Sequence, residues 1–424
     1  EIVDLTHDAR GVARLGGKTV FVPGALPGES VEIRILRRHA RHDEARLLRV
    51  ERSAHSRSTP PCPHVGACGG CALQHLEPGG QPPLRRRQLE QALSRIAGLA
   101  PGRWLGTLAA EPWGYRTRAR LAVCRETGSD RLRLGYRTAD SRRVAAVEQC
   151  AVLDPALSGL IAPMAEALSA LPRDEAPKEV LLARGDEGVA AALLGERAPA
   201  ESTRGTLSRF ALAQGIALGF GVQRAQAREA EWESPAPELF YSPEDGTRIA
   251  FAPWDFTQAN RALNRELVRQ VIGLLAPGPG DRVLDLFCGL GNFSLPLARR
   301  AGEVIGVEGL GSQVARARSN ADLNQLTNCR FEQAALDREP GRSGWAASRP
   351  DLVLLDPPRA GAAALVPWLG GCGARRICYV SCDAGTLARD AARLAAAGYR
   401  LAAAGALEMF PQTTHFESVA LFER

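Results

Sequence analysis

An apolar run that leads into a glycine-rich turn and then a helical stretch is the feature that most constrains the fold of this chain. It is VLDLFCGLGNFSLPLA, residues 283–298. Three further apolar runs follow, with helical sequence between them: GEVIGVEG, PDLVLLDPP and RRICYVSC. Strands that alternate with helices in this way are typical of a doubly wound parallel sheet. We therefore predict a Rossmann-like α/β domain over residues 239–424.

The glycine-rich turn predicts a nucleoside-type ligand, because such a turn presents backbone N–H groups and allows close backbone approach. Glu308 ends the next strand, 19 residues after Gly289, where a carboxylate accepts hydrogen bonds from ribose hydroxyls. A dinucleotide would favour a third glycine at position 294, but the chain has Ser294. The turn therefore favours S-adenosylmethionine. A tight turn that binds nothing is the alternative.

Two later strands end in reactive residues, Asp356 in LLDPPRAG and Cys382 in YVSCDAGT. Ligands of open α/β sheets bind at the carboxyl edge, so both should face the crevice. A thiolate beside a methyl donor suggests nucleophilic catalysis on a pyrimidine, whose C5 is a poor nucleophile until a thiolate adds at C6. A base must then remove the C5 proton. His415 and Glu417, in TTHFESVALFER, are the candidates; a surface His–Glu ion pair is the alternative.

A cysteine-rich loop predicts a metal site. The stretch TPPCPHVGACGGCALQHL, residues 59–76, carries Cys62, Cys68 and Cys71. Three thiolates need a fourth ligand, for which Cys150 is the first candidate and Cys124 the second. Structural zinc usually shows two close ligand pairs, whereas an iron–sulfur cluster accepts a triplet with one distant residue. The spacing therefore favours a [4Fe–4S] cluster, with zinc as the alternative.

Residues 1–55 predict a small β-barrel of the OB type, a common nucleic-acid module. Turns at Pro23-Gly24 and Pro27-Gly28 separate β-branched runs, and Val31, Ile33 and Ile35 alternate onto one face. A barrel without a ligand is the alternative.

We predict that residues 56–238 form a central domain that contains the cysteine-rich loop and an RNA-facing sheet. A helix is expected over residues 81–98, with four apolar residues in phase: Leu84, Leu89, Leu93 and Ile96. A strand over residues 115–123 would place Arg116, Arg118 and Arg120 on one face, as a phosphate contact or as a merely solvated face.

The basic residues are almost all arginine. Lysine occurs only at Lys18 and Lys178, among 53 basic residues and a net charge of +6. Guanidinium groups suit phosphate contacts, although codon bias in a GC-rich genome explains the ratio equally well. The chain has neither a long uninterrupted apolar stretch nor a basic-then-apolar N-terminal segment, so we predict a cytoplasmic location without membrane contact.

Together these motifs resemble the RNA uracil-C5 methyltransferase family, in particular its TRAM-domain, iron–sulfur branch that acts on 23S ribosomal RNA. The resemblance extends over nearly the whole chain and is carried by FVPGALPGE, CGGCALQHL, FTQAN, DLFCGLGNFSLPLA, LLDPPRAG, YVSCDAGTLARD and HFESVALF. It implies that residues 1–55 are a TRAM domain and that part of segment 80–112 packs on the catalytic domain.

The resemblance also implies residue roles. Cys382 would be the nucleophile and Glu417 the base that removes the C5 proton. The residues that would contact S-adenosylmethionine are Gln258, Phe287, Asn292, Glu308 and Asp356. The ligands of a [4Fe–4S] cluster would be Cys62, Cys68, Cys71 and Cys150. One departure is that Ala334 and Ala335 follow RFEQ, where the family often has an adenine-contacting Asn or Asp.

The predicted partner is 23S ribosomal RNA, with the target base flipped out of its stack and no obligate protein partner. The nearest alternative is the same chemistry on tRNA. The TRAM domain and the cysteine-rich loop argue against it, because the family's tRNA enzymes are expected to resemble only the catalytic part. An RNA-binding iron–sulfur sensor would have lost Cys382 or Glu417, and a Rossmann dehydrogenase is disfavoured by Ser294 and by DPPR.

Overall fold

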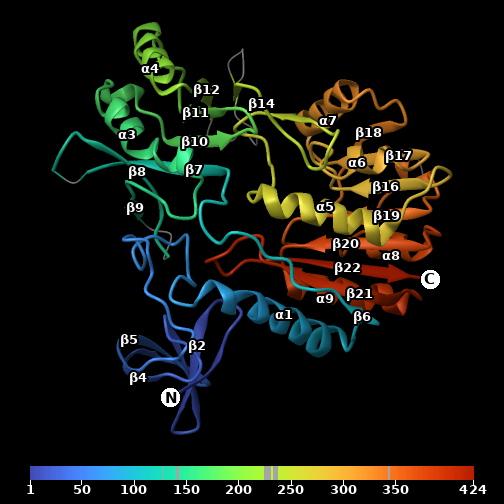
Figure 1. The fold of residues 1–424 in the computed structure, drawn as a ribbon, viewed down its shortest axis with the longest axis horizontal. Helices are drawn as coiled ribbons and strands as arrows, with labels where there is room; N and C mark the ends of the chain where they lie inside the picture. Colours follow the sequence, from blue (N-terminus) through green and yellow to red (C-terminus); the bar gives the residue numbers. More distant parts are fainter. Residues whose placement is uncertain (127, 140–142, 224–230, 233–236, 342–343) are drawn as a thin grey trace.

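The computed structural model describes residues 1–126, 128–139, 143–223, 231–232, 237–341 and 344–424. Four β-sheets organise these residues. The N-terminal sheet and the central sheet lie at the left of Figure 1, one below the other, and an eight-stranded sheet fills the right. The proposed domain limits at 55/56 and 238/239 stay a prediction.

The N-terminal sheet has five strands in the order β1-β2-β3-β5-β4. Its strands are β1 (Ile2–Leu5), β2 (Arg10–Leu15), β3 (Lys18–Pro23), β4 (Ser30–Arg38) and β5 (His42–Arg52). The backbone N–H of Ile2 donates to the carbonyl of Glu29, and that of Gly28 donates to the carbonyl of Ile2, which brings the first strand to the turn before β4. Val31, Ile33 and Ile35 pack against the core, so the predicted alternation is confirmed.

The central sheet has seven strands in the order β13-β12-β11-β10-β7-β8-β9. Its strands are β7 (Arg118–Arg125), β8 (Leu132–Arg137), β9 (Val144–Ala146), β10 (Glu179–Arg184), β11 (Val189–Gly195), β12 (Ala217–Val222) and β13 (Glu231–Trp232). The helices in this region are α2 (Pro155–Ser158), α3 (Ile161–Ser169), the short 3₁₀ turn η3 (Arg173–Glu175) and α4 (Glu201–Gln214). Residues of α3 and α4 share one apolar core with the sheet.

The three arginines expected on one face of the central sheet have separate environments. Arg116 precedes β7 and lines a cavity that also contains cysteines. Arg118 donates to the carbonyl oxygen of Thr257 at 3.3 Å, and exposed Arg120 donates to Glu179 at 2.7 Å. Strand alternation predicts which side chains share a face but not what packs against them. These arginines therefore do not form an open row of cations.

The eight-stranded sheet has the order β18-β17-β16-β19-β20-β22-β21-β6. Its strands are β6 (Arg103–Trp104), β16 (Arg282–Leu286), β17 (Glu303–Glu308), β18 (Cys329–Gln333), β19 (Leu352–Leu355), β20 (Arg376–Ser381), β21 (Arg400–Leu407) and β22 (Glu417–Glu423). Strands β16 to β20 pair in parallel, and β22 lies antiparallel between β20 and β21. The predicted doubly wound sheet is confirmed.

Helices cover both faces of this sheet and enclose two apolar cores. They are α5 (Arg261–Leu275), α6 (Ser294–Ala298), α7 (Gly311–Leu323), the 3₁₀ turn η4 (Gly344–Ala347), α8 (Val366–Gly371) and α9 (Ala384–Ala396). A hairpin of β14 (Leu239–Tyr241) and β15 (Ile249–Phe251) shares a further core with α7 and with residues of the central sheet. No helix of the described ranges is long and apolar enough to cross a bilayer.

Helix α1 (Gln81–Ala92) follows the 3₁₀ turn η1 (Pro78–Gly80) and runs beside α9 and β21 (Figure 1). Leu89 and Leu93 are fully buried in the core of the eight-stranded sheet. Ile96, expected in the same phase, is 55% exposed. The reason is that residues Leu93–Ala97 form a π-helical turn, which has more residues per turn and shifts the apolar phase.

Candidate active site and cysteine cavity

Four of the predicted site residues lie at the carboxyl ends of neighbouring parallel strands. Phe287 follows β16, Glu308 ends β17, Asp356 follows β19 and Cys382 follows β20. The order of these strands is β17-β16-β19-β20. The sheet therefore brings them to one edge, as the sequence predicts.

Glu417 reaches the same edge from the opposite direction. It begins β22, which runs antiparallel to β20 with Ser418 opposite Ser381, so the start of β22 meets the end of β20. The Ser418 hydroxyl donates to the carbonyl of Ser381 at 2.9 Å, which fixes the two strands beside Cys382. Glu417 is 4% exposed. A surface ion pair is therefore the wrong interpretation of this carboxylate.

Burial disfavours ionisation of Asp356, Glu417 and Cys382. Burial raises the pKa of Asp356 to about 7. Burial, and then the charge of Asp356, raise the pKa of Glu417 well above its usual range. The pKa of Cys382 rises to about 11 through burial and the charges of Glu417 and Asp356, while the Arg359 guanidinium opposes the rise in pKa of both Cys382 and Glu417. Arg359 is thus the cation that favours a thiolate here.

A cleft of about 710 Å³ opens at Cys382. One wall includes Arg359, His415 and Phe416. Helix α1 and the turn that follows it contribute a second wall, and residues 4–8, at the end of β1, contribute a third. An Arg359 Nη2 lies 2.9 Å from His415 Nε2, so the imidazole accepts from the guanidinium. The cleft is wide enough to admit more than a free nucleobase, and three parts of the chain line it.

The residues predicted to hold S-adenosylmethionine fit a polar ligand. Buried Gln258 approaches Asp356 with Nε2 at 3.5 Å from Oδ2, and its Oε1 has no partner among the described residues. The Glu308 carboxylate accepts backbone N–H groups of Gly289, at 3.2 Å, and Gly309, at 2.7 Å. Phe287 has a φ of 66°, a strained value for a non-glycine residue that is typical of ligand sites. The orphaned amide oxygen offers an acceptor to an amino or hydroxyl group.

Asn292 has protein partners for both side-chain atoms. It exchanges hydrogen bonds with the Asn264 amide at 2.8 and 3.0 Å, and Tyr241 donates to its Oδ1 at 3.1 Å. Its contact with the cofactor stays a prediction.

Ser294 occupies the position where a dinucleotide-binding turn would have its third glycine. Its buried hydroxyl donates to Asp285 at 2.5 Å. Burial raises the pKa of Asp285 to about 7, a group that sequence reasoning missed.

All four predicted cluster cysteines line one cavity of about 110 Å³: Cys62, Cys68, Cys71 and Cys150. Cys124, the other candidate, is not among its lining residues. Sequence reasoning missed His64, which also lines the cavity and whose Nε2 is buried without a partner among the described residues. The position of His64, two residues after Cys62 in the cysteine-rich loop, could have indicated that it lies near the cysteines.

The four cavity sulfurs are not gathered as tightly as the ligands of one zinc ion. Four thiolates on one tetrahedral zinc ion, with bonds of about 2.3 Å, would lie roughly 3.8 Å apart. In the described part of the chain, only His39, His42 and Glu44 place three possible ligand atoms within 4.8 Å of one another, so no three of the cavity sulfurs do. The [4Fe–4S] cluster stays a prediction.

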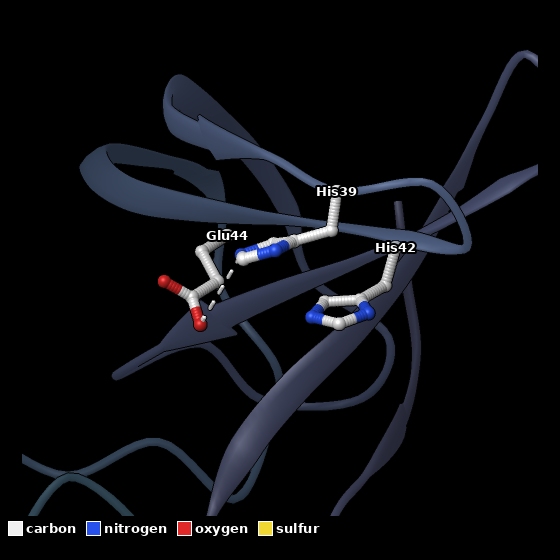
Figure 2. A group of neighbouring side chains, drawn as sticks. All are labelled: His39, His42 and Glu44. Atoms are coloured by element: carbon white, nitrogen blue, oxygen red, sulfur yellow. Dashed lines mark ion pairs between the residues drawn. The ribbon is translucent and has the colours of Figure 1, made fainter.

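The His39, His42 and Glu44 group lies on the β4–β5 hairpin of the N-terminal sheet (Figure 2). The two imidazole rings stack at 4.5 Å between centroids, and His42 packs against Phe21 at 5.4 Å. His39 Nε2 lies 3.9 Å from Glu44 Oε1. Ring packing accounts for this arrangement, and none of its residues lines either cavity described above.

Comparison with known proteins matches two parts of the chain to family models, a TRAM domain at residues 1–48 and a methyltransferase domain at residues 277–380. The chain is 43% identical to the 23S rRNA (uracil(1939)-C(5))-methyltransferase RlmD of Dechloromonas aromatica over 428 residues, which cover 100% of this chain and 99% of that protein. It is 44% identical to the Pseudomonas aeruginosa protein of the same name, over 99% of this chain and 92% of that one. The chain belongs to the RlmD family of methyltransferases.

The fold of this chain is also similar to that of a solved methyltransferase that acts on tRNA. The tRNA (uracil-54, C5)-methyltransferase of Pyrococcus abyssi, in complex with S-adenosyl-L-homocysteine, matches with a TM-score of 0.76 and 26% identity over 99% of both chains. The expectation that tRNA enzymes resemble only the catalytic part is therefore wrong. The overall architecture does not distinguish rRNA from tRNA as the substrate.

Proposed function

We propose that this chain methylates C5 of a uridine in 23S ribosomal RNA, through a covalent bond between Cys382 and C6 of the base. The observation that carries the proposal is the meeting of Cys382 and Glu417 at the adjoining ends of β20 and β22. The choice of 23S rRNA rests on the relatives that share 43% and 44% of their residues with this chain.

The methyl donor is S-adenosylmethionine, which supplies a methyl group on a sulfonium sulfur. The residues that would hold it are Gln258, Phe287, Asn292, Glu308 and Asp356. Gln258 offers its unpartnered Oε1, and Glu308 is already oriented by the backbone of the glycine-rich turn. The carboxylates place negative charge beside a cationic ligand, which favours its binding.

Cys382 opens the reaction. Its thiolate adds to C6 of the flipped uracil, and the ring electrons make C5 nucleophilic. Because burial and two acids raise the pKa of this thiol to about 11, the thiolate needs a nearby cation and a proton acceptor. Arg359 is the cation, and the Asp356 carboxylate would accept the thiol proton, which leaves Glu417 ionised for the later step.

Glu417 closes the reaction. After C5 is methylated, the ionised carboxylate removes the C5 proton, and elimination restores the thiolate of Cys382 and the aromatic ring. The Glu417 Oε2 atom has no partner among the described residues and is available for this proton. A buried carboxylate is a stronger base than an exposed one, which suits the task.

The four cavity cysteines would hold a [4Fe–4S] cluster. The support is the cavity that all four cysteines share, whose sulfurs are not gathered around a single ion. Transfer of a methyl cation and release of a proton require no electron carrier. We therefore propose a structural role for the cluster.

The cleft would receive the RNA. Arg87 and Arg95 of the α1 region line it together with Arg359, and residues of the TRAM sheet line it as well. Phosphate contacts from these groups would make RNA binding weaken with salt. A base flipped from folded RNA would reach Cys382, which lines the cleft.

The first test is Cys382→Ala, assayed with unmethylated 23S rRNA and with tRNA. The variant should bind RNA as the wild type does but transfer no methyl group, while Cys372→Ala, a half-buried cysteine outside the cleft, should stay active. Full activity of Cys382→Ala would overturn nucleophilic catalysis. Methylation of tRNA alone would overturn the substrate assignment.

The second test is Glu417→Gln. Without a base for the C5 proton, the covalent protein–RNA adduct should accumulate and be visible on a denaturing gel. Normal turnover without an adduct would contradict the role of Glu417.

A further inference from the structure

One segment touches both the cysteine cavity and the catalytic cleft. Residues 408–416, the linking segment, join the end of β21 to Glu417 at the start of β22. Thr413 lines the cysteine cavity, whereas Thr414, His415 and Phe416 line the cleft. A shift of this segment would therefore move the carboxylate that removes the proton.

Gln412 ties the linking segment to the cysteine loop, residues 59–76. Its carbonyl oxygen accepts the backbone N–H groups of Ala72, at 2.8 Å, and Leu73, at 2.9 Å, the two residues that follow Cys71. Its own N–H donates to Gln81 Oε1 at 2.8 Å, and Gln81 Nε2 donates to its Oε1 at 3.0 Å. Gln412 is fully buried.

The backbone of Gln412 is strained. Its φ is 71°, in the left-handed region that a side chain other than glycine, asparagine or aspartate rarely adopts. Such a conformation persists only where surrounding contacts impose it. Neighbouring contacts add to the restraint: Tyr115 donates to the carbonyl of Pro411 at 2.9 Å, and Arg85 donates to that of Thr413 at 2.6 Å.

We propose that Gln412 is a positioning residue for the methylation reaction, through which the cysteine loop holds the linking segment and so sets the place of Glu417. This inference rests on the proposed roles of Glu417 and of the cluster cysteines. On this inference the cluster supports catalysis without any redox step. It would keep the cysteine loop folded, and the folded loop presents the two N–H groups that hold the Gln412 carbonyl. Displacement of a reacting group by about 1 Å can slow a reaction roughly 100-fold.

The test is Gln412→Gly, which keeps the backbone bonds possible and accepts the positive φ but removes the hydrogen bond that Gln81 Nε2 donates to the Gln412 side chain. We expect kcat to fall roughly 10- to 100-fold, KM for RNA to stay within about twofold, and the covalent RNA adduct to accumulate. Iron content should be unchanged. The matched control is Gln325→Gly, an exposed glutamine with a φ of 57° after α7, which should leave kcat and adduct level unchanged.

Gln81→Leu provides a second variant, since it removes both hydrogen bonds between the two residues and leaves Gln412 itself intact. A normal kcat in both variants with full iron content would overturn the inference. So would a loss of activity strictly proportional to lost iron, because Gln412 would then only stabilise the cysteine loop. Glu417→Gln, assayed beside them, distinguishes failure of the proposed function from failure of this inference. If Glu417→Gln forms no adduct, the proposed function fails. If it forms the adduct while the Gln412 and Gln81 variants behave normally, this inference alone fails.

Discussion

Replacement of Arg85 by methionine should destabilise the catalytic domain strongly, because it leaves a buried carboxylate without a partner. Arg85 and Glu408 are 1% and 3% exposed. The Arg85 Nε lies 3.2 and 3.0 Å from the two carboxylate oxygens, and Nη2 lies 3.1 Å from Oε1. The same Nη2 donates to the carbonyl of Thr413 at 2.6 Å. The variant therefore strands one charge and one backbone acceptor.

The loss of one partner from a buried pair costs about 3–5 kcal/mol. For a domain of this size, each kcal/mol lowers Tm by about 2–4 °C, so Tm should fall by roughly 10 °C. Burial raises the pKa of Glu408, and the Arg85 charge opposes that rise. Without Arg85 the pKa rises further, so the penalty should be largest at alkaline pH and shrink as the carboxyl is protonated in acid.

Calorimetry of the wild type and three variants provides the assay. Arg87→Met is the matched control, since Arg87 is half exposed on the same helix and pairs with Asp4 at 2.9 Å; its loss should cost under about 1 kcal/mol. Arg85→Met/Glu408→Met, which removes both charges, should recover most of the stability. A Tm within about 2 °C of wild type for Arg85→Met, or no recovery in the double variant, would refute the reasoning.

Three further predictions concern charge and metal. Arg359→Gln removes the cation that opposes the raised pKa values of Cys382 and Glu417. The pH–rate profile should therefore move to higher pH, and the rate near neutrality should fall about tenfold if the pKa of the thiol rises by about one pH unit. An unmoved profile would contradict this role. Asp285 binds a proton up to about pH 7 when folded but only to about 3.8 when unfolded, so it lowers stability progressively as pH rises through that window. Asp285→Asn should therefore raise Tm more at about pH 8 than at about pH 5, and equal differences would argue against a neutral Asp285. Protein purified without oxygen should be brown with about four irons per chain, Cys150→Ala should lose that iron and Cys124→Ala should keep it; stoichiometric zinc would decide for the other metal.

The local patterns of the sequence were enough to predict the catalytic sheet. Each of its four expected strands is an apolar run followed by a turn, and the carboxyl edge of a parallel sheet is where such turns meet. Glu308, Asp356 and Cys382 therefore could be assigned to one edge from the sequence alone. The serine at position 294 showed that a dinucleotide turn was disfavoured, but its bond to Asp285 could not be predicted, because Asp285 looks like one polar residue inside an apolar strand.

The sequence pattern of a single strand or helix failed to predict side-chain contacts and exposure where a second element packs against it. Arg118 shares its predicted face with Arg120, yet it donates to a carbonyl beyond the central sheet. Ile96 keeps the apolar phase of α1 in the sequence and loses it in a π-helical turn. The surface-pair interpretation of Glu417 failed for the same reason, since burial depends on everything that surrounds a side chain.

By itself, the sequence determined the strand order along the chain, the reactive residues at the strand ends and the cysteine triplet, because periodicity and turn chemistry act over a few neighbouring residues. Only the tertiary structure showed that Cys150, the first candidate, lines one cavity with the triplet while Cys124 does not. It alone decided that Arg85 meets Glu408 and that Gln412 links the cysteine loop to the segment before Glu417. These contacts join residues far apart in the chain. Their geometry follows from how whole elements pack, and no short pattern encodes it.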